Sequence, residues 1–317
     1  MNYIYPKLIY IELTNHCDLR CFMCPNGNNM LTDKGFIDDS TFYKVVDELS
    51  EWNRDIPVGL YNMGDSLLHK KLIPYIKYVS KKGLSTFLST NGYNLNDDLQ
   101  AQLPESGLNQ ITFSFEAEDP AEYERIRINS SYERVKRNIL GFLEKNNNRI
   151  KTTILVIKYG IDKSLDISDE FKNMFKHFDV NFYSYHASDW RGTININILK
   201  RDTTGLVPKK GLCHHVNCPV IDWRGNFLHC PCDYNADFPI GSVKTENVID
   251  LFNSNLMNMV RDKMQKGLWN TLKICKNCSA PYCEDTKKRL IENFDKKEII
   301  YKDMRTKMID DKKFNDN

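Results

Sequence analysis

Three cysteines near the start of the chain have a spacing that suits metal chemistry. Cys17, Cys21 and Cys24 stand with three and then two residues between them. Thiolates at this spacing can hold three corners of a cubic four-iron cluster, which leaves one iron without a protein ligand. A pure electron carrier normally takes four cysteines, so an open iron is useful where a small molecule must bind the metal directly. The triplet therefore favours an enzyme.

Structural zinc is the competing interpretation of this segment. His16 lies beside Cys17 and could supply a fourth ligand. Short zinc motifs usually combine two CxxC or HxxxH arms, however, and one arm here has a three-residue gap. Three cysteines within eight residues are also unlike the isolated buried cysteines of a hydrophobic core. The iron–sulfur interpretation is therefore favoured.

Composition limits the partners that we expect. The 317-residue chain has 44 basic and 42 acidic side chains and a net charge of +2, so it has no long-range attraction for nucleic acid or an anionic membrane. No apolar run approaches the length of a membrane span, and the first residues do not resemble a secretory signal. We expect a cytoplasmic protein that binds neither nucleic acid nor membranes.

Strand-like and helix-like segments alternate over the first part of the chain. Strands are predicted at 8–13, 58–62, 85–89, 110–115, 151–158 and 180–185, and helices at 40–52, 73–82, 96–103, 131–145 and 167–178. This alternation predicts an α/β fold with a parallel sheet covered by helices. The cysteine triplet and several polar residues follow predicted strands, so they should meet at the carboxyl ends of the strands. Barrels built from alternating strands and helices place their active sites at that end.

The triplet and its surroundings resemble the radical S-adenosylmethionine (SAM) superfamily. The run LIYIELTNHC at 8–17 is similar to the first strand and cluster loop of that family, and Pro25 follows the third cysteine as is usual there. The resemblance implies a partial (β/α)6 TIM-like barrel in which Cys17, Cys21 and Cys24 hold a [4Fe–4S] cluster whose open iron binds SAM. An electron from that cluster would cleave SAM to a 5′-deoxyadenosyl radical, which abstracts hydrogen from a substrate C–H bond.

Further motifs of the family are matched in part. The run MGDSLLH at 63–69 resembles the family's GGEPLLH, with aspartate where glutamate is more usual. The runs STNG at 89–92 and FSFE at 113–116 resemble the family's STNG and iSiD. Arg127 matches an arginine that pairs with the SAM carboxylate, a task that suits its two-pronged guanidinium. By resemblance, the SAM contacts are Met63, Gly64, Asp65, Ser89, Asn91, Ser114 and Arg127.

The other seven cysteines lie between residues 213 and 283. A hairpin with its turn at 223–226 is predicted between Cys218 and Cys230, and Cys275 and Cys278 form a CxxC pair. Spacing alone leaves zinc and an iron–sulfur cluster equally open. The pattern resembles the SPASM or shorter twitch extension of radical SAM enzymes, which holds auxiliary [4Fe–4S] clusters. That resemblance implies one auxiliary cluster bound by Cys218, Cys230, Cys275 and Cys278, with Cys213 as the strongest competitor.

Two cysteines remain after this assignment. Radical epimerases of the family return a hydrogen atom to the substrate radical from a free cysteine, so Cys232 and Cys283 are candidate hydrogen-atom donors. The alternative is that they neighbour the cluster or fill space in the core. We expect a barrel core at 1–190, a SPASM/twitch-like module at 191–283 and a charged C-terminal helix or tail at 284–317.

The resemblance also implies a reaction class. We expect a radical SAM oxidoreductase or epimerase that receives electrons from a donor such as flavodoxin or ferredoxin. The first predicted strand starts almost at the N-terminus, which leaves no room before it for a leader-peptide-binding domain. A small-molecule or carbohydrate substrate of a biosynthetic pathway is therefore favoured, with maturation of a ribosomal peptide or protein side chain as the alternative. A non-catalytic zinc-binding protein is the remote alternative.

Overall fold

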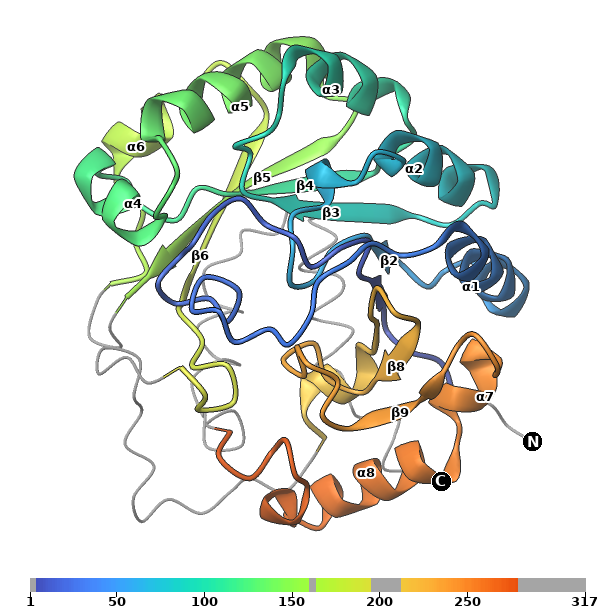
Figure 1. Ribbon diagram of the computed structural model, residues 1–317. Coiled ribbons are helices and arrows are strands. Elements are labelled where there is room, and N and C mark those ends of the chain that lie inside the picture. Colours follow the sequence, from blue (N-terminus) through green and yellow to red (C-terminus); the bar gives the residue numbers. More distant parts are fainter. Residues whose placement is uncertain (1–3, 160–163, 195–211, 279–317) are drawn as a thin grey trace.

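The computed structural model describes residues 4–159, 164–194 and 212–278 (Figure 1). Six strands pair in parallel and in chain order, which makes the sheet of a partial (β/α)6 barrel, as predicted. They are β1 (Ile9–Ile11), β2 (Val58–Gly59), β3 (Thr86–Thr90), β4 (Gln110–Ser114), β5 (Lys151–Lys158) and β6 (Val180–His186).

Helices lie along the outside of these strands in Figure 1. They are α1 (Asp39–Trp52), α2 (Leu72–Lys81), α3 (Asp97–Gln102), α4 (Pro120–Ile126), α5 (Tyr132–Asn146) and α6 (Asp169–Asn173). Five of the six helices are preceded by an N-cap residue whose side chain accepts a hydrogen bond from the backbone N–H three residues later. This bond satisfies one of the free N–H donors of the first turn. The capping residues are Asp38, Asn96, Asp119, Ser131 and Ser168.

Two helices differ from the sequence prediction. α6 is five residues long, whereas a helix was predicted over 167–178. α4 was not predicted, because it is short and follows β4 after a tight loop. Short 3-10 segments complete the connections: η1 (Ser66–Leu68), η2 (Leu103–Glu105), η3 (His214–Asn217) and η4 (Trp269–Thr271).

Aromatic side chains pack the helices onto the sheet and onto each other. Phe42 of α1 stacks on Tyr75 of α2 with ring centroids 3.8 Å apart, and Phe113 of β4 meets Phe142 of α5 edge to face at 5.4 Å. All four side chains are fully buried. Such contacts between large apolar surfaces fix the strands, and with them the loops at the carboxyl ends of the strands.

The C-terminal module continues the barrel sheet. β7 (Val220–Ile221) pairs in parallel with β1, while β8 (Asn226–Leu228) and β9 (Pro239–Ser242) follow antiparallel. The order β6-β5-β4-β3-β2-β1-β7-β8-β9 therefore makes one nine-stranded sheet in the described part of the chain. The β7–β8 hairpin was predicted at its correct turn, but its pairing with β1 was not. α7 (Val248–Phe252) and α8 (Asn255–Gln265) complete the module.

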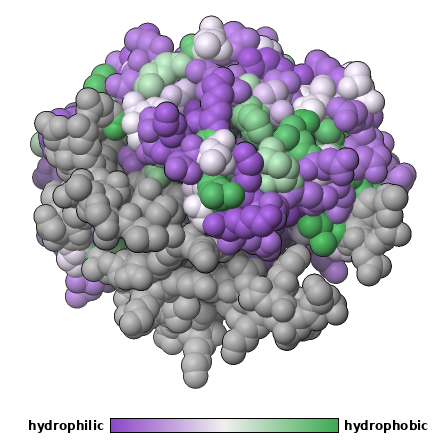
Figure 2. Space-filling view, turned by 90° about the horizontal axis from the view of Figure 1, so that it is seen from below, coloured by the Kyte–Doolittle hydropathy of each residue, from purple (hydrophilic) through white to green (hydrophobic). Residues whose placement is uncertain are grey.

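The part of the surface that Figure 2 colours by hydropathy is mostly hydrophilic, with hydrophobic residues in small patches. In the ranges that the structure describes, every helix is too short or too polar to cross a bilayer. Cys283 and the predicted tail at 284–317 lie outside the described residues.

Candidate active site

The cysteine triplet lies in the long loop between β1 and α1, which runs across the middle of the barrel in Figure 1. This loop is folded back on itself by hydrogen bonds. The N–H of Cys24 donates to the carbonyl of Cys21 at 3.0 Å, and Asn28 Nδ2 donates to the carbonyls of Phe22 and Cys24 at 2.7 and 2.9 Å. The three thiols are thereby held close together at the carboxyl ends of the strands.

Two side-chain donors from other elements point at these sulfurs. Asn91 Nδ2, after β3, donates to Cys17 Sγ at 3.7 Å, and Arg127 Nη1, after α4, donates to Cys21 Sγ at 3.6 Å. N–H donors stabilise the anionic thiolate, which is the form that binds iron. Burial raises the pKa of Cys17 and Cys21 to about 12, so these thiols need a bound metal to ionise at neutral pH. The site therefore fits a thiolate-bound cluster.

The loop after β2 packs tightly against the cluster loop. The N–H of Asp65 donates to the carbonyl of His16 at 2.9 Å. A Cβ atom on Gly64 would lie 2.4 Å from the carbonyl oxygen of Thr14, which is closer than such atoms can approach. Gly64 is thus required where the two loops meet.

Asp65 connects this loop to the one after β3. Its buried carboxylate accepts hydrogen bonds from Leu67 N at 3.0 Å, Thr90 Oγ1 at 2.8 Å and Asn91 N at 2.8 Å. The contacts position Asn91, the residue that donates to Cys17. A contact between Asp65 and the amine of SAM stays a prediction.

Arg127 takes part in a buried ion pair that the sequence did not predict. Its Nη2 lies 2.5 Å from Glu116 Oε1 and also donates to the carbonyl of Ser114 at 3.0 Å. The side chains of Arg127 and Glu116 are 7% and 4% exposed, and Tyr159 donates its hydroxyl to Glu116 at 3.3 Å. Arg127 Nε is buried and has no hydrogen-bond partner in the structure. That donor is what the arginine can offer to a bound ligand such as the SAM carboxylate.

The remaining predicted SAM contacts lie at the same end of the sheet. Ser89 at the end of β3 and Ser114 at the end of β4 bring their hydroxyls to within 3.5 Å of each other. Met63 is buried beside the cluster loop, where its carbonyl accepts a hydrogen bond from Asn26 Nδ2 at 3.4 Å. The structure thus brings all seven residues to one rim, and their contacts with SAM stay predictions.

Glu12 is a further rim residue that sequence reasoning missed. It follows β1, is buried, and accepts hydrogen bonds from Met63 N and Asn62 Nδ2, both at 3.0 Å. Burial raises the pKa of this carboxyl to about 7, with a smaller contribution from nearby Asp222. The available signal was an acidic residue inside the otherwise apolar run of the first strand.

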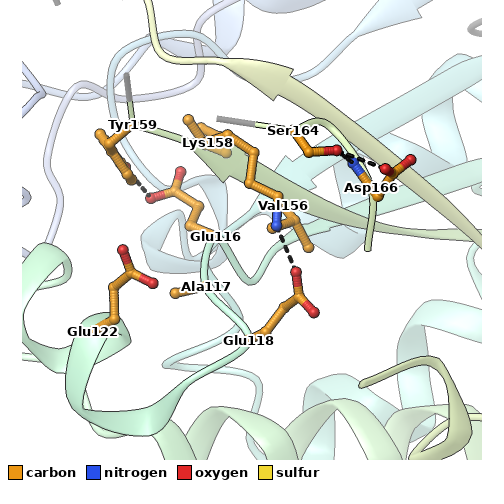
Figure 3. Close-up of a pocket in the computed structure, with 10 residues that line it drawn as sticks. Glu116, Ala117, Glu118, Glu122, Val156, Lys158, Tyr159, Ser164 and Asp166 are labelled. Carbon is orange, nitrogen blue, oxygen red and sulfur yellow. Dashed lines mark hydrogen bonds and ion pairs between the residues drawn. The ribbon is translucent and has the colours of Figure 1, made fainter. Parts of the chain in front are cut away.

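A cavity of about 260 Å³ opens at the carboxyl ends of β4 and β5 (Figure 3). Glu116 and Tyr159 form part of its wall, so the cavity adjoins the ion pair of Arg127. Glu118 and Lys158 also line it and form an ion pair of 2.5 Å. A cavity with charged walls therefore adjoins the ion pair whose arginine also donates to Cys21.

Five C-terminal cysteines lie in one neighbourhood, where their thiol groups interact electrostatically: Cys213, Cys230, Cys232, Cys275 and Cys278. Cys218 has apolar neighbours. It is buried with Leu8 and Phe87 in an apolar cluster that is separate from the main core. The intervening η3 segment turns the chain between Cys213 and Cys218. This difference supports Cys213 rather than Cys218 as the fourth auxiliary ligand, and the ligand set stays a prediction.

The two candidate hydrogen-atom donors fall in different places. Cys232 lies beside Cys230, and the hydrogen bond between the two thiols, together with burial, raises the pKa of Cys232 well above its usual value. It is therefore a protonated thiol when no metal is bound. Cys283 lies outside the described residues. The donor role of both cysteines stays a prediction.

The module contacts the cluster loop directly. Arg224, in the β7–β8 turn, pairs with Asp33 at 2.9 Å. Asn235 donates to the carbonyl of Met30 at 2.9 Å and accepts the N–H of Thr32 at 3.1 Å. An ion pair and two hydrogen bonds therefore join the module that carries the C-terminal cysteines to the loop that carries the triplet.

Comparisons with known proteins match both parts of the chain. A family model described as the radical SAM superfamily matches residues 11–169, and one described as an iron–sulfur cluster-binding domain (SPASM) matches residues 213–279. The SAM-dependent 2-deoxy-scyllo-inosamine dehydrogenase of Niallia circulans is 20% identical over 280 residues, which are 86% of this chain and 92% of that protein. The tungsten-containing aldehyde ferredoxin oxidoreductase cofactor-modifying protein of Pyrococcus furiosus is 28% identical over 110 residues, which are 35% of this chain and only 31% of that protein's length.

Two solved structures share the fold. BtrN in complex with AdoMet and 2-DOIA superimposes with a TM-score of 0.62 and 16% identity, covering 88% of this chain and 94% of that one. SuiB of Streptococcus suis, bound to its precursor peptide SuiA, gives a TM-score of 0.65 and 13% identity, covering 92% of this chain and 74% of that one.

The radical SAM model covers half of the chain and includes the whole cysteine triplet. The two matched families imply that the cofactors of this protein are a SAM-binding [4Fe–4S] cluster, SAM itself and an auxiliary iron–sulfur cluster, rather than structural zinc. The chain therefore belongs to the radical SAM superfamily, as an enzyme with a SPASM domain.

Proposed function

We propose that the protein oxidises a small, hydroxyl-bearing molecule, such as a carbohydrate or cyclitol, by radical removal of hydrogen from carbon. The observation that carries this proposal is that the module with the auxiliary cysteines extends the barrel sheet and contacts the loop of the catalytic triplet. A second redox centre in a module attached in this way suits a reaction that must remove an electron from the substrate.

The chain's own residues have separate roles in this proposal. Cys17, Cys21 and Cys24 hold the catalytic cluster, and the auxiliary cluster is held by Cys213, Cys230, Cys275 and Cys278. The domain limits are those expected from the sequence, a core at 1–190, a module at 191–283 and a tail at 284–317. When bound, the cofactors supply the electron that cleaves SAM, the 5′-deoxyadenosyl radical and an acceptor for the substrate's electron.

The remaining rim residues bind and orient. Asn91 and Arg127 stabilise two of the cluster thiolates by N–H donation. Arg127 Nε and the hydroxyls of Ser89 and Ser114 are the donors that we assign to SAM. Met63 and Gly64 offer backbone atoms, and Asp65 holds the loop in place. Positioning of this kind is what the protein contributes to cofactor chemistry.

The proposed oxidation balances in atoms and electrons. A cluster held by Cys17, Cys21 and Cys24 would give one electron to SAM, which would yield methionine and the 5′-deoxyadenosyl radical. That radical would take a hydrogen atom from a secondary alcohol carbon and become 5′-deoxyadenosine. The remaining carbon radical would lose one proton from its hydroxyl group and one electron to the auxiliary cluster, and the product would be a ketone. The auxiliary cluster would pass its electron back to the catalytic cluster or on to an external acceptor. In the second case a donor such as flavodoxin or ferredoxin would reduce the catalytic cluster again.

A small-molecule substrate is supported by the match to the inosamine dehydrogenase, which extends over 92% of that protein. A ribosomal peptide is the second candidate, and the similarity to SuiB with its bound precursor peptide favours it. Epimerisation is the alternative chemistry, with Cys232 returning a hydrogen atom in place of the loss of an electron.

The first experiment is anaerobic purification with iron reconstitution, followed by incubation with SAM, dithionite and a uniformly deuterated aminocyclitol. We expect about eight irons per chain, as two four-iron clusters require. We also expect deuterium in 5′-deoxyadenosine and a ketone that reacts with a hydrazine reagent. SAM cleavage with deuterium transfer but a product of inverted stereochemistry would indicate epimerisation. An absence of deuterium transfer from any cyclitol or sugar, with transfer from a peptide, would refute the small-molecule assignment.

A further inference from the structure

Arg191 is a buried cation between the barrel and the auxiliary cysteines. It lies after β6, and its side chain is 6% exposed. Its Nη1 pairs with Asp233 at 3.5 Å and its Nη2 pairs with Asp237 at 3.4 Å. The side chain of Asp233 is completely buried and also accepts the N–H groups of Asp237 and Phe238, both at 3.0 Å. The guanidinium is therefore fixed by two carboxylates of the module.

The guanidinium is near enough to three auxiliary thiols for its charge to act on them. Its positive charge interacts electrostatically with Cys230, Cys232 and Cys275. Arg191 Nε is buried and has no hydrogen-bond partner in the structure. A buried donor without a partner is costly, because it has lost its bonds to water without replacing them. A sulfur atom of a bound cluster would supply the missing acceptor.

The backbone at Arg191 is held in an unusual conformation. Trp190, Arg191 and Gly192 have φ angles of 48°, 66° and 72°, so three consecutive residues are left-handed. Two of them carry a side chain and are disfavoured in this region. A Cβ on Gly192 would lie 2.4 Å from the carbonyl oxygen of Asn277, between Cys275 and Cys278. The turn is thus pressed against the CxxC ligand loop, and strain of this kind persists where the surrounding structure requires it.

We propose that Arg191 is a positioning residue for the auxiliary cluster: its Nε–H donates to a cluster sulfur atom, and its charge offsets the negative charge of the cluster and of Asp233. This inference rests on the ligand set of Cys213, Cys230, Cys275 and Cys278 proposed above. Four thiolates around a four-iron cluster leave it negatively charged, and hydrogen bonds to its sulfur atoms are among the features that set its reduction potential. Without Arg191, the cluster and the buried Asp233 carboxylate would oppose each other without a cation between them.

The test measures the auxiliary cluster alone. The full-length chain with Cys17, Cys21 and Cys24 changed to Ala is reconstituted with iron and sulfide, and it is titrated redox-potentiometrically with electron paramagnetic resonance as readout. In this background, Arg191→Gln should shift the one-electron reduction equilibrium towards the oxidised cluster by at least tenfold, which is about 59 mV. Arg191→Lys keeps the charge and should shift it less. Arg224→Gln is the matched control, because Arg224 also joins the module to the barrel through an ion pair with Asp33 and should leave the potential unchanged.

The outcomes separate this inference from the ligand assignment. A parent chain that binds no iron would refute the ligand set and the role of Arg191 with it. A parent chain that binds about four irons, with the same potential in Arg191→Gln, would overturn the role of Arg191 alone. If Arg191→Gln binds no iron, Arg191→Lys decides: iron binding at a near-parental potential supports the charge effect, and equal loss in both variants overturns it.

Discussion

The two cysteine groups are assembled in different ways. Cys17, Cys21 and Cys24 come from one loop, and single side chains after β3 and after α4 donate to two of their sulfurs. The auxiliary thiols come from three separated segments, around residues 213, 230–232 and 275–278, and the charge among them is supplied by Arg191 after β6. The first site is therefore mainly local in sequence, while the second exists only when the whole fold is complete.

The largest effect that this comparison predicts is for the local site. Changing Cys17, Cys21 and Cys24 together to Ala should abolish SAM cleavage and lower the iron content from about eight to about four per chain. The module should keep its cluster, because its ligands lie elsewhere. Iron and sulfide counts with a 5′-deoxyadenosine assay check this. Loss of all the iron would mean that the two sites depend on each other.

The assembled site is tested by a pair of matched substitutions. Cys213→Ser should remove the auxiliary cluster and roughly half of the iron, because Cys213 lies among the other auxiliary thiols. Cys218→Ser should leave the iron content intact, because Cys218 lies in an apolar cluster with Leu8 and Phe87. Both variants should retain SAM cleavage. The opposite pattern would restore Cys218 as a ligand, as the sequence suggested.

A third prediction concerns the buried ion pair beside the triplet. Arg127→Met leaves the Glu116 carboxylate buried without its cation, so the free energy of unfolding should fall by about 3–5 kcal/mol. The double variant Arg127→Met with Glu116→Gln removes the unpaired charge and should recover part of that loss. Urea unfolding of the iron-free proteins measures both. Equal stability of the single and double variants would contradict the proposed cause.

A fourth prediction is a pH dependence caused by Glu12. Burial raises the pKa of its carboxyl in the folded protein to about 7, whereas the unfolded chain has the ordinary lower value. The folded protein therefore holds this proton more tightly, and stability falls as pH rises from about 4.5 to 7. The shift corresponds to about 3 kcal/mol. Asp222 is the nearby charged group that adds to the effect.

Glu12→Gln should flatten this dependence, since glutamine cannot ionise and keeps acceptor and donor atoms of similar geometry. Urea midpoints at pH 5 and pH 7.5 give the comparison, with the exposed Glu51→Gln as control. The wild-type protein and Glu51→Gln should lose stability over this interval by similar amounts. If Glu12→Gln follows the same curve as both, Glu12 is not the titrating group.

The smallest effect on stability is expected at the ion pair that joins the C-terminal module to the loop of the triplet. Asp33 pairs with Arg224 and its side chain is 50% exposed, so Asp33→Ala should lower the free energy of unfolding by no more than about 1 kcal/mol. Raising the salt concentration should reduce the difference further. A loss several times larger would show that this contact, rather than the β1–β7 pairing, holds the module on the barrel.

The comparison also explains which features could be predicted from sequence. The six parallel strands and the hairpin turn at 223–226 follow from local hydrophobic patterns and turn residues, and the cysteine triplet from its spacing. The Arg127–Glu116 pair and the neighbourhood of Cys213 depend on how distant segments pack, which no local pattern encodes. The short helix α4 was missed because seven residues give too few turns for a clear periodic signal.

The pairing of β7 with β1 has a consequence for how the protein is made. β1 is synthesised long before β7, so its edge that pairs with β7 waits for that partner until residues 220 and 221 leave the ribosome. Over that time the nascent barrel presents an open strand edge, which invites pairing with other chains. The loop with the cysteine triplet follows directly from this strand, so its contacts with the C-terminal module form only after that module has been synthesised.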